Sequence, residues 1–181
     1  MNCNGYIDVK FSNYIVINHT TKTKEYQSSE NIPVAISVNT DCIGVVLQNE
    51  KFTLDAPVAV PNPCDPDDRA KDILVDEVSL NVVRVSGMIG YRVGIDVLES
   101  SSNVLFDSFT PLQWASIDST IEVEYKPLLL NVEDGEEAPD ITVRVVELEV
   151  NFKMDSDAID KCYLITGTFR IEPVEPAPQI I

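Results

Sequence analysis

The chain carries a single histidine, His19, and this limits the chemistry that its side chains can perform. Ser-His-Asp and Cys-His catalysis both need an imidazole beside the nucleophile, so His19 would have to serve in either. The sequence contains no G-x-S-x-G, H-E-x-x-H or glycine-rich phosphate-loop motif that would supply the rest of such a site. We therefore expect a protein that is not an enzyme, and we interpret the glycosylation sequon Asn18-His19-Thr20 as a chance match.

Carboxylates are abundant, with 30 Asp and Glu residues, and three acidic clusters have the character of calcium loops. Hard cations need several oxygen ligands that converge from one loop. The tightest spacing is that of Asp155, Asp157 and Asp160, although the EF-hand glycine and terminal glutamate are missing. Two interpretations stay open, a calcium site at these three residues or acidic loops that face solvent. Calcium is the only cofactor that the sequence suggests.

Four cysteines are the remaining reactive side chains, and none of them has the C-x-x-C spacing of a zinc or thioredoxin-like site. Three lie near expected loops or chain ends, where a thiol is placed to cross-link neighbouring chains. The fourth opens a short strand and is predicted to be a buried free thiol. The sequence cannot rank the three possible internal pairings. The candidates for cross-links between subunits are Cys3, Cys42, Cys64 and Cys162.

The formal net charge is -17, from 13 Lys and Arg against 30 Asp and Glu. Such a charge repels phosphate backbones and anionic lipid, so nucleic acid is not an expected partner. No apolar run reaches the roughly 18 residues of a membrane helix, so membrane insertion is not expected either. The first ten residues show no basic region followed by an apolar one, so we see no secretory signal. We expect synthesis in the cytoplasm, with a cell or spore surface as a destination after assembly.

The elements that would position these groups are strands. Apolar and polar residues alternate over most of the chain, most clearly at residues 121–126, which is typical of half-buried strands. The alternation slips phase at residues 145–146 and again at residues 82–83, which predicts β-bulges. Ser86-Gly87 is interpreted as the turn of a hairpin, and the proline-rich residues 60–69 as a stiff connector. Aromatic residues in the apolar phase are predicted to be core: Tyr91, Tyr125, Phe152, Tyr163 and Phe169.

These segments amount to on the order of ten strands, so we predict an all-β fold, an antiparallel β-sandwich of jelly-roll type with an N-terminal extended arm. A barrel is the second choice. The predicted divisions are an arm and linker at residues 1–31, a sandwich domain at residues 32–172 and a proline-rich tail at residues 173–181. The arm contains alternating residues that suit a strand added to a neighbour. They are Tyr6, Ile7, Val9, Phe11, Tyr14, Ile15, Val16 and Ile17.

Three features resemble the self-assembling spore-surface and endospore-appendage subunits of Firmicutes: the start Met1-Asn-Cys3, the connector with its cysteine, and the stretch Val85-Ser-Gly-Met-Ile-Gly-Tyr-Arg-Val-Gly-Ile-Asp-Val97. The resemblance covers the arm and part of residues 73–126. In such subunits a cysteine-bearing arm docks into the jelly roll of the next subunit and is locked by disulfides. The resemblance implies that Cys3 is the arm cysteine, with Cys42, Cys64 or Cys162 as receiver. This chain departs from the pattern, since its arm has one cysteine and no glycine-rich spacer.

Two functions are therefore considered. The first is a structural subunit that assembles with copies of itself into a filament or surface layer, through the arm and strand pairing. The second is a carbohydrate- or calcium-binding β-sandwich module or adhesin, in which Trp114 and the acidic loops face the ligand.

Overall fold

The computed structural model describes residues 5–64, 67–99, 114–130, 132, 135–153 and 160–174, and almost all of their regular structure is strand. The all-β prediction is therefore confirmed, although these residues form six strands rather than about ten. None of their helical segments is long and apolar enough to cross a membrane. In chain order the elements are β1 (Ile7–Ile17), the 3-10 turn η1 (Ser29–Asn31), β2 (Val34–Val60), the 3-10 turn η2 (Arg69–Lys71), β3 (Ile73–Ile95), β4 (Ala115–Leu130), β5 (Ile141–Lys153) and β6 (Lys161–Pro173).

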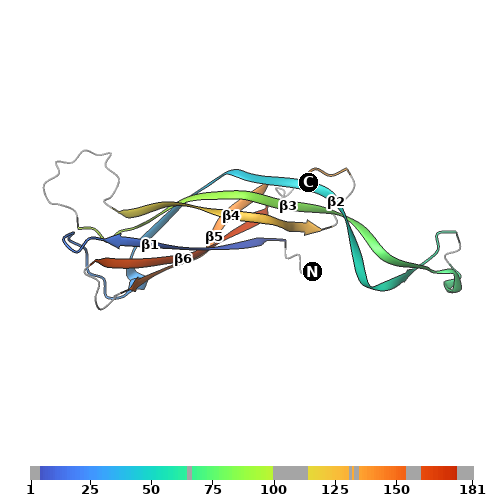
Figure 1. Ribbon diagram of the computed structural model, residues 1–181, viewed down its shortest axis with the longest axis horizontal. Coiled ribbons are helices and arrows are strands. Elements are labelled where there is room, and N and C mark those ends of the chain that lie inside the picture. Colours follow the sequence, from blue (N-terminus) through green and yellow to red (C-terminus); the bar gives the residue numbers. More distant parts are fainter. Residues whose placement is uncertain are drawn as a thin grey trace, which may run out of the picture.

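The strands form two antiparallel sheets of three strands each. One sheet has the order β1-β6-β5 and the other the order β2-β3-β4. Apolar side chains of both sheets belong to a single buried cluster, so the two sheets share one hydrophobic core. The molecule is elongated, because β2 and β3 continue far beyond the other strands (Figure 1).

Several segments that the sequence suggested as separate short strands are continuous. β2 runs through 27 residues and β3 through 23. The predicted hairpin at Ser86-Gly87 is wrong, because β3 continues through these residues without a turn and both of them pair with β2. Gly87 has φ +133°, and a Cβ there would lie 2.1 Å from the Cys42 carbonyl oxygen. The glycine thus marks a kink within a strand, where the register with β4 shifts.

The two predicted phase slips correspond to real irregularities. The register between β5 and β6 shifts between Val145 and Glu147. In β3, Val82 and Val83 are both fully buried, and the register with β4 shifts directly after Val83. Consecutive buried residues on a strand require such a departure from strict alternation. Both bulges could therefore be predicted from the sequence.

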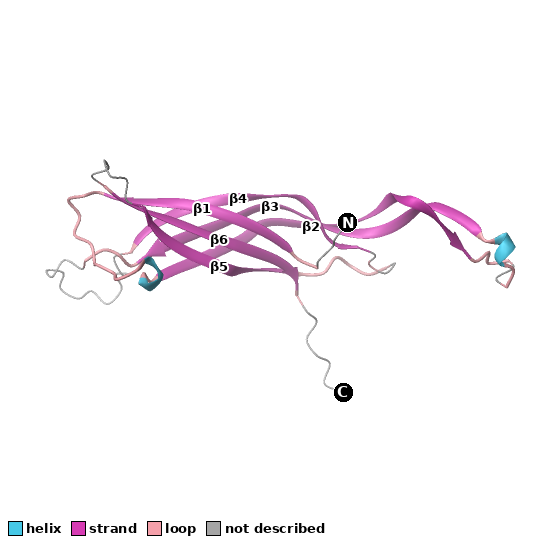
Figure 2. Ribbon diagram, turned by 90° about the horizontal axis from the view of Figure 1, so that it is seen from below, coloured by secondary structure: helices cyan, strands magenta, loops and turns pink. Residues whose placement is uncertain are grey.

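The strand-forming part of the predicted arm is β1, which pairs with β6 of the same chain over its whole length. Five of its side chains are buried in the shared core. The predicted linker after it is bonded to the segment that follows β3, through Lys24 N to Val97 O at 2.8 Å and Glu99 N to Lys22 O at 3.2 Å. In this chain β1 is thus an edge strand of its own sheet, since β6 is its only strand partner among the described residues (Figure 2).

Three aromatic rings join the two sheets at the centre of the core. The Phe11 ring of β1 lies 4.6 Å from that of Phe169 on β6 and 4.9 Å from that of Tyr91 on β3. The Tyr91 and Phe169 rings meet edge to face at 5.1 Å, a favoured aromatic geometry. Phe11 has room only because its partner across the strand pair is Gly167. A Cβ on that glycine would lie 2.5 Å from Phe11 Cζ and 2.7 Å from the Glu147 carbonyl oxygen.

Gly167→Ala is predicted to destabilise the fold by about 1–3 kcal/mol, because the new methyl group overpacks the core beside Phe11. The matched control is Gly90→Ala, where the nearest atom to the added Cβ lies at 3.7 Å and a change within about 0.5 kcal/mol is expected. Urea unfolding of the two variants measures the difference. Equal stability of both variants would contradict the packing of Phe11 described here.

Candidate functional site

The most unusual feature of the molecule is a two-stranded ribbon made by the distal halves of β2 and β3. β4 pairs with β3 only as far as Val82, which faces Leu130. Beyond that point, residues 49–60 of β2 and residues 73–81 of β3 have only each other as strand partners in the described chain. At the base of the ribbon, Asn81 is also hydrogen-bonded to Val132. Figure 1 shows this ribbon extending away from the body. An isolated two-stranded ribbon is at best marginally stable in water.

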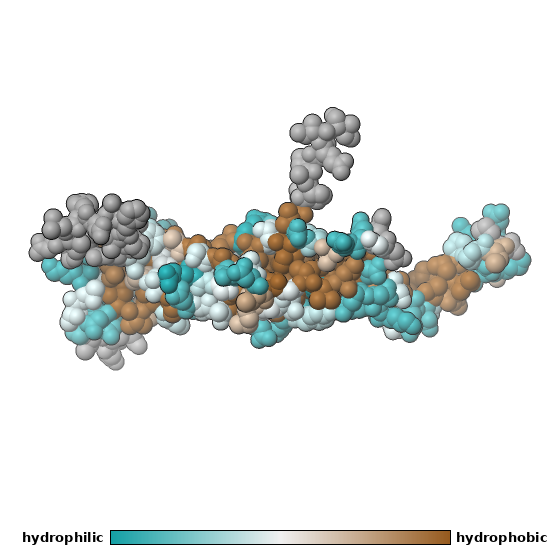
Figure 3. Space-filling view, turned by 90° about the horizontal axis from the view of Figure 1, so that it is seen from above, coloured by the Kyte–Doolittle hydropathy of each residue, from teal (hydrophilic) through white to brown (hydrophobic). Residues whose placement is uncertain are grey.

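The far end of the ribbon is apolar on both of its faces. Val58, Ala59 and Val60 pair with Val75, Leu74 and Ile73 in that order. Because neighbouring residues on a strand point to opposite sides, both faces here are made of apolar side chains. The exposed fractions are 51% for Val58, 46% for Ile73 and 70% for Leu74, and Figure 3 shows apolar surface gathered on the ribbon. Uninterrupted apolar runs are typical of strands that are covered on both faces.

The ribbon is closed by the connector that the prolines and acids of residues 60–69 suggested. Asp68 caps η2 by accepting a hydrogen bond from Ala70 N at 3.1 Å. Cys64 N donates to Asn62 Oδ1 at 3.0 Å, which is a local side-chain turn. The connector is therefore the tip of a long hairpin rather than a link between two domains.

A charged clamp holds the base of the ribbon to the body. Arg84 on β3 donates two hydrogen bonds to the Glu50 carboxylate on β2, at 2.5 and 2.8 Å. Its guanidinium carbon also lies 5.0 Å from the centre of the Tyr125 ring on β4, within cation–π range. The Arg84 hydrogen bonds, helped by one from Gln48, lower the pKa of Glu50 to about 2. The direction in which the ribbon leaves the body is thus fixed by residues of three strands.

Figure 2 shows η1 toward the end of the molecule opposite the ribbon. A cleft of about 530 Å³ lies beside η1, with Ser29 in its lining. Its apolar lining includes Ile32, Phe152 and Tyr163, and the last two rings lie 5.1 Å apart. Two ammonium groups also line it. Lys24 Nζ pairs with Asp96 Oδ1 at 2.5 Å, and Lys161 Nζ bonds to the Thr23 hydroxyl.

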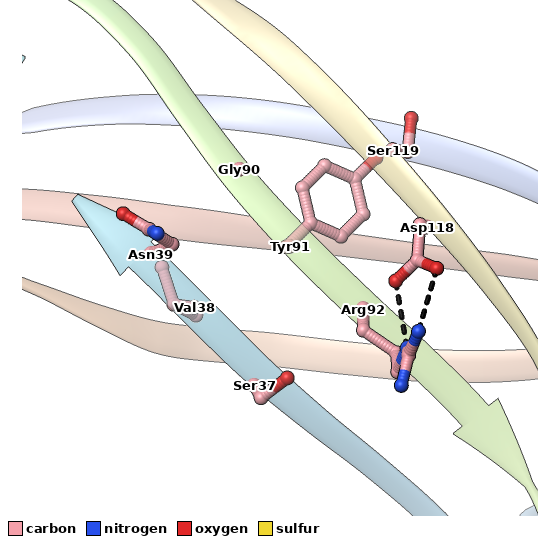
Figure 4. A pocket seen from close by; sticks show the side chains of 8 residues that line it. All are labelled: Ser37, Val38, Asn39, Gly90, Tyr91, Arg92, Asp118 and Ser119. Atoms are coloured by element: carbon pink, nitrogen blue, oxygen red, sulfur yellow. Dashed lines mark hydrogen bonds and ion pairs between the residues drawn. The ribbon is translucent and has the colours of Figure 1, made fainter. Parts of the chain in front are cut away.

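A second, shallow pocket of about 380 Å³ lies on the β2-β3-β4 sheet (Figure 4). Its dominant polar feature is the Arg92–Asp118 ion pair, with two hydrogen bonds of 2.7 Å. These bonds raise the pKa of Arg92 and lower that of Asp118. The Arg92 and Asp118 charges neutralise each other, and both side chains are largely exposed. The pocket residues contain no histidine or cysteine, so their arrangement does not resemble a nucleophile with its base.

The cysteines are scattered over the described residues, and each of the three that can be seen is free. Cys64 is exposed at the ribbon tip, and Cys162 is half-buried at the start of β6. The prediction that Cys42 is buried is wrong, because it lies exposed on the edge strand β2 beside a register shift. Cys3 lies outside the described residues. Cross-links between chains remain a prediction.

The arm residues divide cleanly between the two faces of β1. Ile7, Val9, Phe11, Ile15 and Ile17 point into the core, while Tyr14 and Val16 are exposed. Tyr6 precedes the strand, and its ring lies 3.8 Å beneath the Arg170 guanidinium carbon. Arg170 also binds the Asp8 carboxylate at 2.7 and 2.8 Å, and these bonds lower the pKa of Asp8.

The calcium hypothesis rests on residues that are only partly visible, since Asp155 and Asp157 lie outside the described residues. Asp160 Oδ1 accepts a hydrogen bond from the backbone N of His19 at 3.0 Å and lies 3.2 Å from its Nδ1. These contacts, the backbone bond first, lower the pKa of Asp160. In the part of the chain that the structure describes, no three His, Cys, Asp or Glu side chains gather as a metal site would require.

Of the predicted core aromatics, Tyr91, Tyr163 and Phe169 are buried, whereas Tyr125 and Phe152 are exposed. The prediction fails for these two because Tyr125 follows a register shift, and Phe152 lines the cleft at the end of its sheet. The ribbon itself was missed. The available signal was a pair of apolar runs, residues 58–60 and 73–75, on either side of a turn.

No family model, curated protein or solved structure matches this chain.

Acid is predicted to weaken the clamp at the ribbon base. Glu50 titrates near 4.5 when unperturbed and at about 2 in the fold, so its contribution to stability is complete above pH 4.5 and is lost as the pH falls toward 2. Glu50→Gln should be less stable than the wild type at pH 7 and lose less stability between pH 4.5 and 2. Thermal melts across this range measure the effect. Glu122→Gln, which removes an exposed charge from β4, is the control, and acid profiles alike for all three proteins would contradict the clamp.

Proposed function

We propose that this protein is a non-enzymatic structural subunit that assembles with copies of itself. The observation that carries the proposal is the projecting ribbon, whose distal residues 58–60 and 73–75 expose apolar side chains on both faces. Exposed apolar strands with open edges are templates for pairing with another chain. Soluble assemblies are most often built from identical subunits. A second copy of the chain is therefore expected to cover the apolar side chains of the ribbon.

The form of the subunit belongs to the same proposal. Two facing antiparallel sheets with one shared core support a β-sandwich. A jelly-roll-like connection is favoured by the pairing of β1, the first strand, with β6, the last. A filament or a layer at a cell or spore surface is the assembly that the resemblance of the sequence suggests.

The N-terminal strand offers a second contact between subunits. β1 is an edge strand whose only strand partner among the described residues is β6, and the 16 residues 18–33 join it to β2. If β1 of one copy took the place of β1 in another, every contact between β1 and β6 would be kept, as in domain swapping. Deleting residues 1–31 would not test this idea, because it would remove five buried side chains from the core.

The wild-type chain is expected to assemble as its concentration rises, and Leu74→Ser to assemble less well, because the most exposed apolar side chain of the ribbon is lost. Val46→Ser is the matched control, since Val46 is exposed on β2, the partner strand of β3, but outside the distal ribbon. Sedimentation velocity and negative-stain microscopy measure the size of the particles. A wild type that stays monomeric throughout would disprove self-assembly.

Strand exchange is tested by cross-linking β1 to β6. Ser12 and Thr166 face each other in this pair, so cysteines at both positions are placed to form a disulfide. In a chain whose four native cysteines are replaced by serine, the oxidised assembly of Ser12→Cys/Thr166→Cys should run as covalent oligomers on non-reducing gels if β1 is exchanged. Covalent bonds found only within single chains would show that each β1 stays in its own subunit.

A further inference from the structure

We propose that the distal ribbon of one subunit seats in the cleft beside η1 of the next subunit. The inference rests on the proposed self-assembly and names the surface that receives the ribbon. The ribbon presents residues 58–60 and 73–75, and the cleft is lined by Ile32, Phe152 and Tyr163 together with Lys24 and Lys161.

The two surfaces lie at opposite ends of the molecule. Figure 2 shows η2 at the ribbon tip and η1 toward the other end of the long axis. A contact between two different surfaces of identical subunits is heterologous, so each subunit gives a ribbon to one neighbour and receives a ribbon from another. Repetition of this contact builds an open chain, as a filament requires, or a closed ring.

Apolar surface is available on both sides of the contact. Leu74, at 70% exposed, is the most exposed large apolar side chain among the described residues, and Phe152 in the cleft is 41% exposed. Both lose water when a ribbon enters the cleft, and burial of apolar surface is the main favourable term in association. A cleft of about 530 Å³ is in the size range of specific binding pockets and can accept the side chains at the ribbon end.

The charges around the two surfaces are also compatible. The distal ribbon is flanked by exposed carboxylates, Asp55, Asp76 and Glu77. In a chain of net charge -17, the cleft lining is unusual, because its two lysines outnumber its one carboxylate, Glu25. The Lys24 charge is paired with Asp96. Lys161 bonds to a hydroxyl, so its ammonium is the group that can attract the acids of an incoming ribbon.

The size of the contact predicts how strongly it holds. Even one whole face of the ribbon, nine residues long and two strands wide, covers only roughly 30 Å by 10 Å, so its burial would remove at most about 600 Å² from water on the two partners together. Stable interfaces bury about 1,200 Å² or more. The seated ribbon is therefore a weak contact in a single pair, and assembly should depend steeply on concentration.

The test is a mixing experiment with two full-length variants that each lack one half of the contact. Leu74→Asp disables the ribbon and keeps the cleft, while Lys161→Glu disables the cleft and keeps the ribbon. Each alone should need at least about tenfold more protein than the wild type to assemble. At protein concentrations at which the wild type assembles, their equimolar mixture should form one-to-one heterodimers and nothing longer, because only one productive contact is possible. Phe152→Ser is a second cleft variant, and Val46→Ser, exposed on β2 outside both surfaces, is the control.

Sedimentation velocity distinguishes the outcomes, and circular dichroism melts establish that each variant is folded. Variants that assemble like the wild type, or a mixture without heterodimers, would overturn the ribbon-in-cleft contact and leave self-assembly standing. A wild type that never assembles would instead overturn the proposed function itself.

Discussion

The packing of Phe11 against Gly167, between Tyr91 and Phe169, is the contact on which the rest of the structure depends. It joins the first strand, the last strand and the middle of the chain at one point of the core. Contacts so distant in sequence form late and slowly during folding, because the chain between them must first be ordered. Once they are formed, β1 cannot leave without opening the aromatic cluster. Exchange of β1 between subunits would therefore occur while chains fold, whereas the ribbon contact is available to a finished subunit.

The second constraint is that one strand, β3, belongs to both the body and the ribbon. Val82, Val83 and Val85 are fully buried on it, and Gly87 lets it bend against Cys42 of β2. The core thereby fixes the strand at one end of the ribbon, and Arg84 fixes it to Glu50 and to Tyr125 directly at the base. The ribbon is thus held in a set direction by the packing of the body, so the proposed contact with a partner would lose less ordering entropy.

The strand character, the antiparallel sheets and the two bulges could be predicted because they follow from the local alternation of apolar and polar residues. The lengths of the strands could not, because residues such as Asn39, Ser86 and Gly87 suit a turn as well as a kink inside a strand, and only pairing with a partner decides. The buried face of β1 was visible in its alternation, but alternation does not say which chain supplies β6. The ribbon could not be predicted from the sequence for a related reason. Runs such as residues 58–60 and 73–75 look like core, and the sequence does not reveal that the sheets end before reaching them.

The length of the ribbon reconciles an apolar contact with the charge of the chain. Two bodies of net charge -17 repel each other, and the repulsion fades over a Debye length of about 8 Å at physiological salt and about 30 Å at 0.01 M. The nine residues of β3 beyond Val82 carry the ribbon end roughly 30 Å from the last residue that pairs with β4. At physiological salt that distance is several Debye lengths, so the apolar end can reach a neighbour while the acidic bodies stay screened from each other. In dilute salt the field of each body extends as far as its own ribbon, and the same contact must form against the full repulsion.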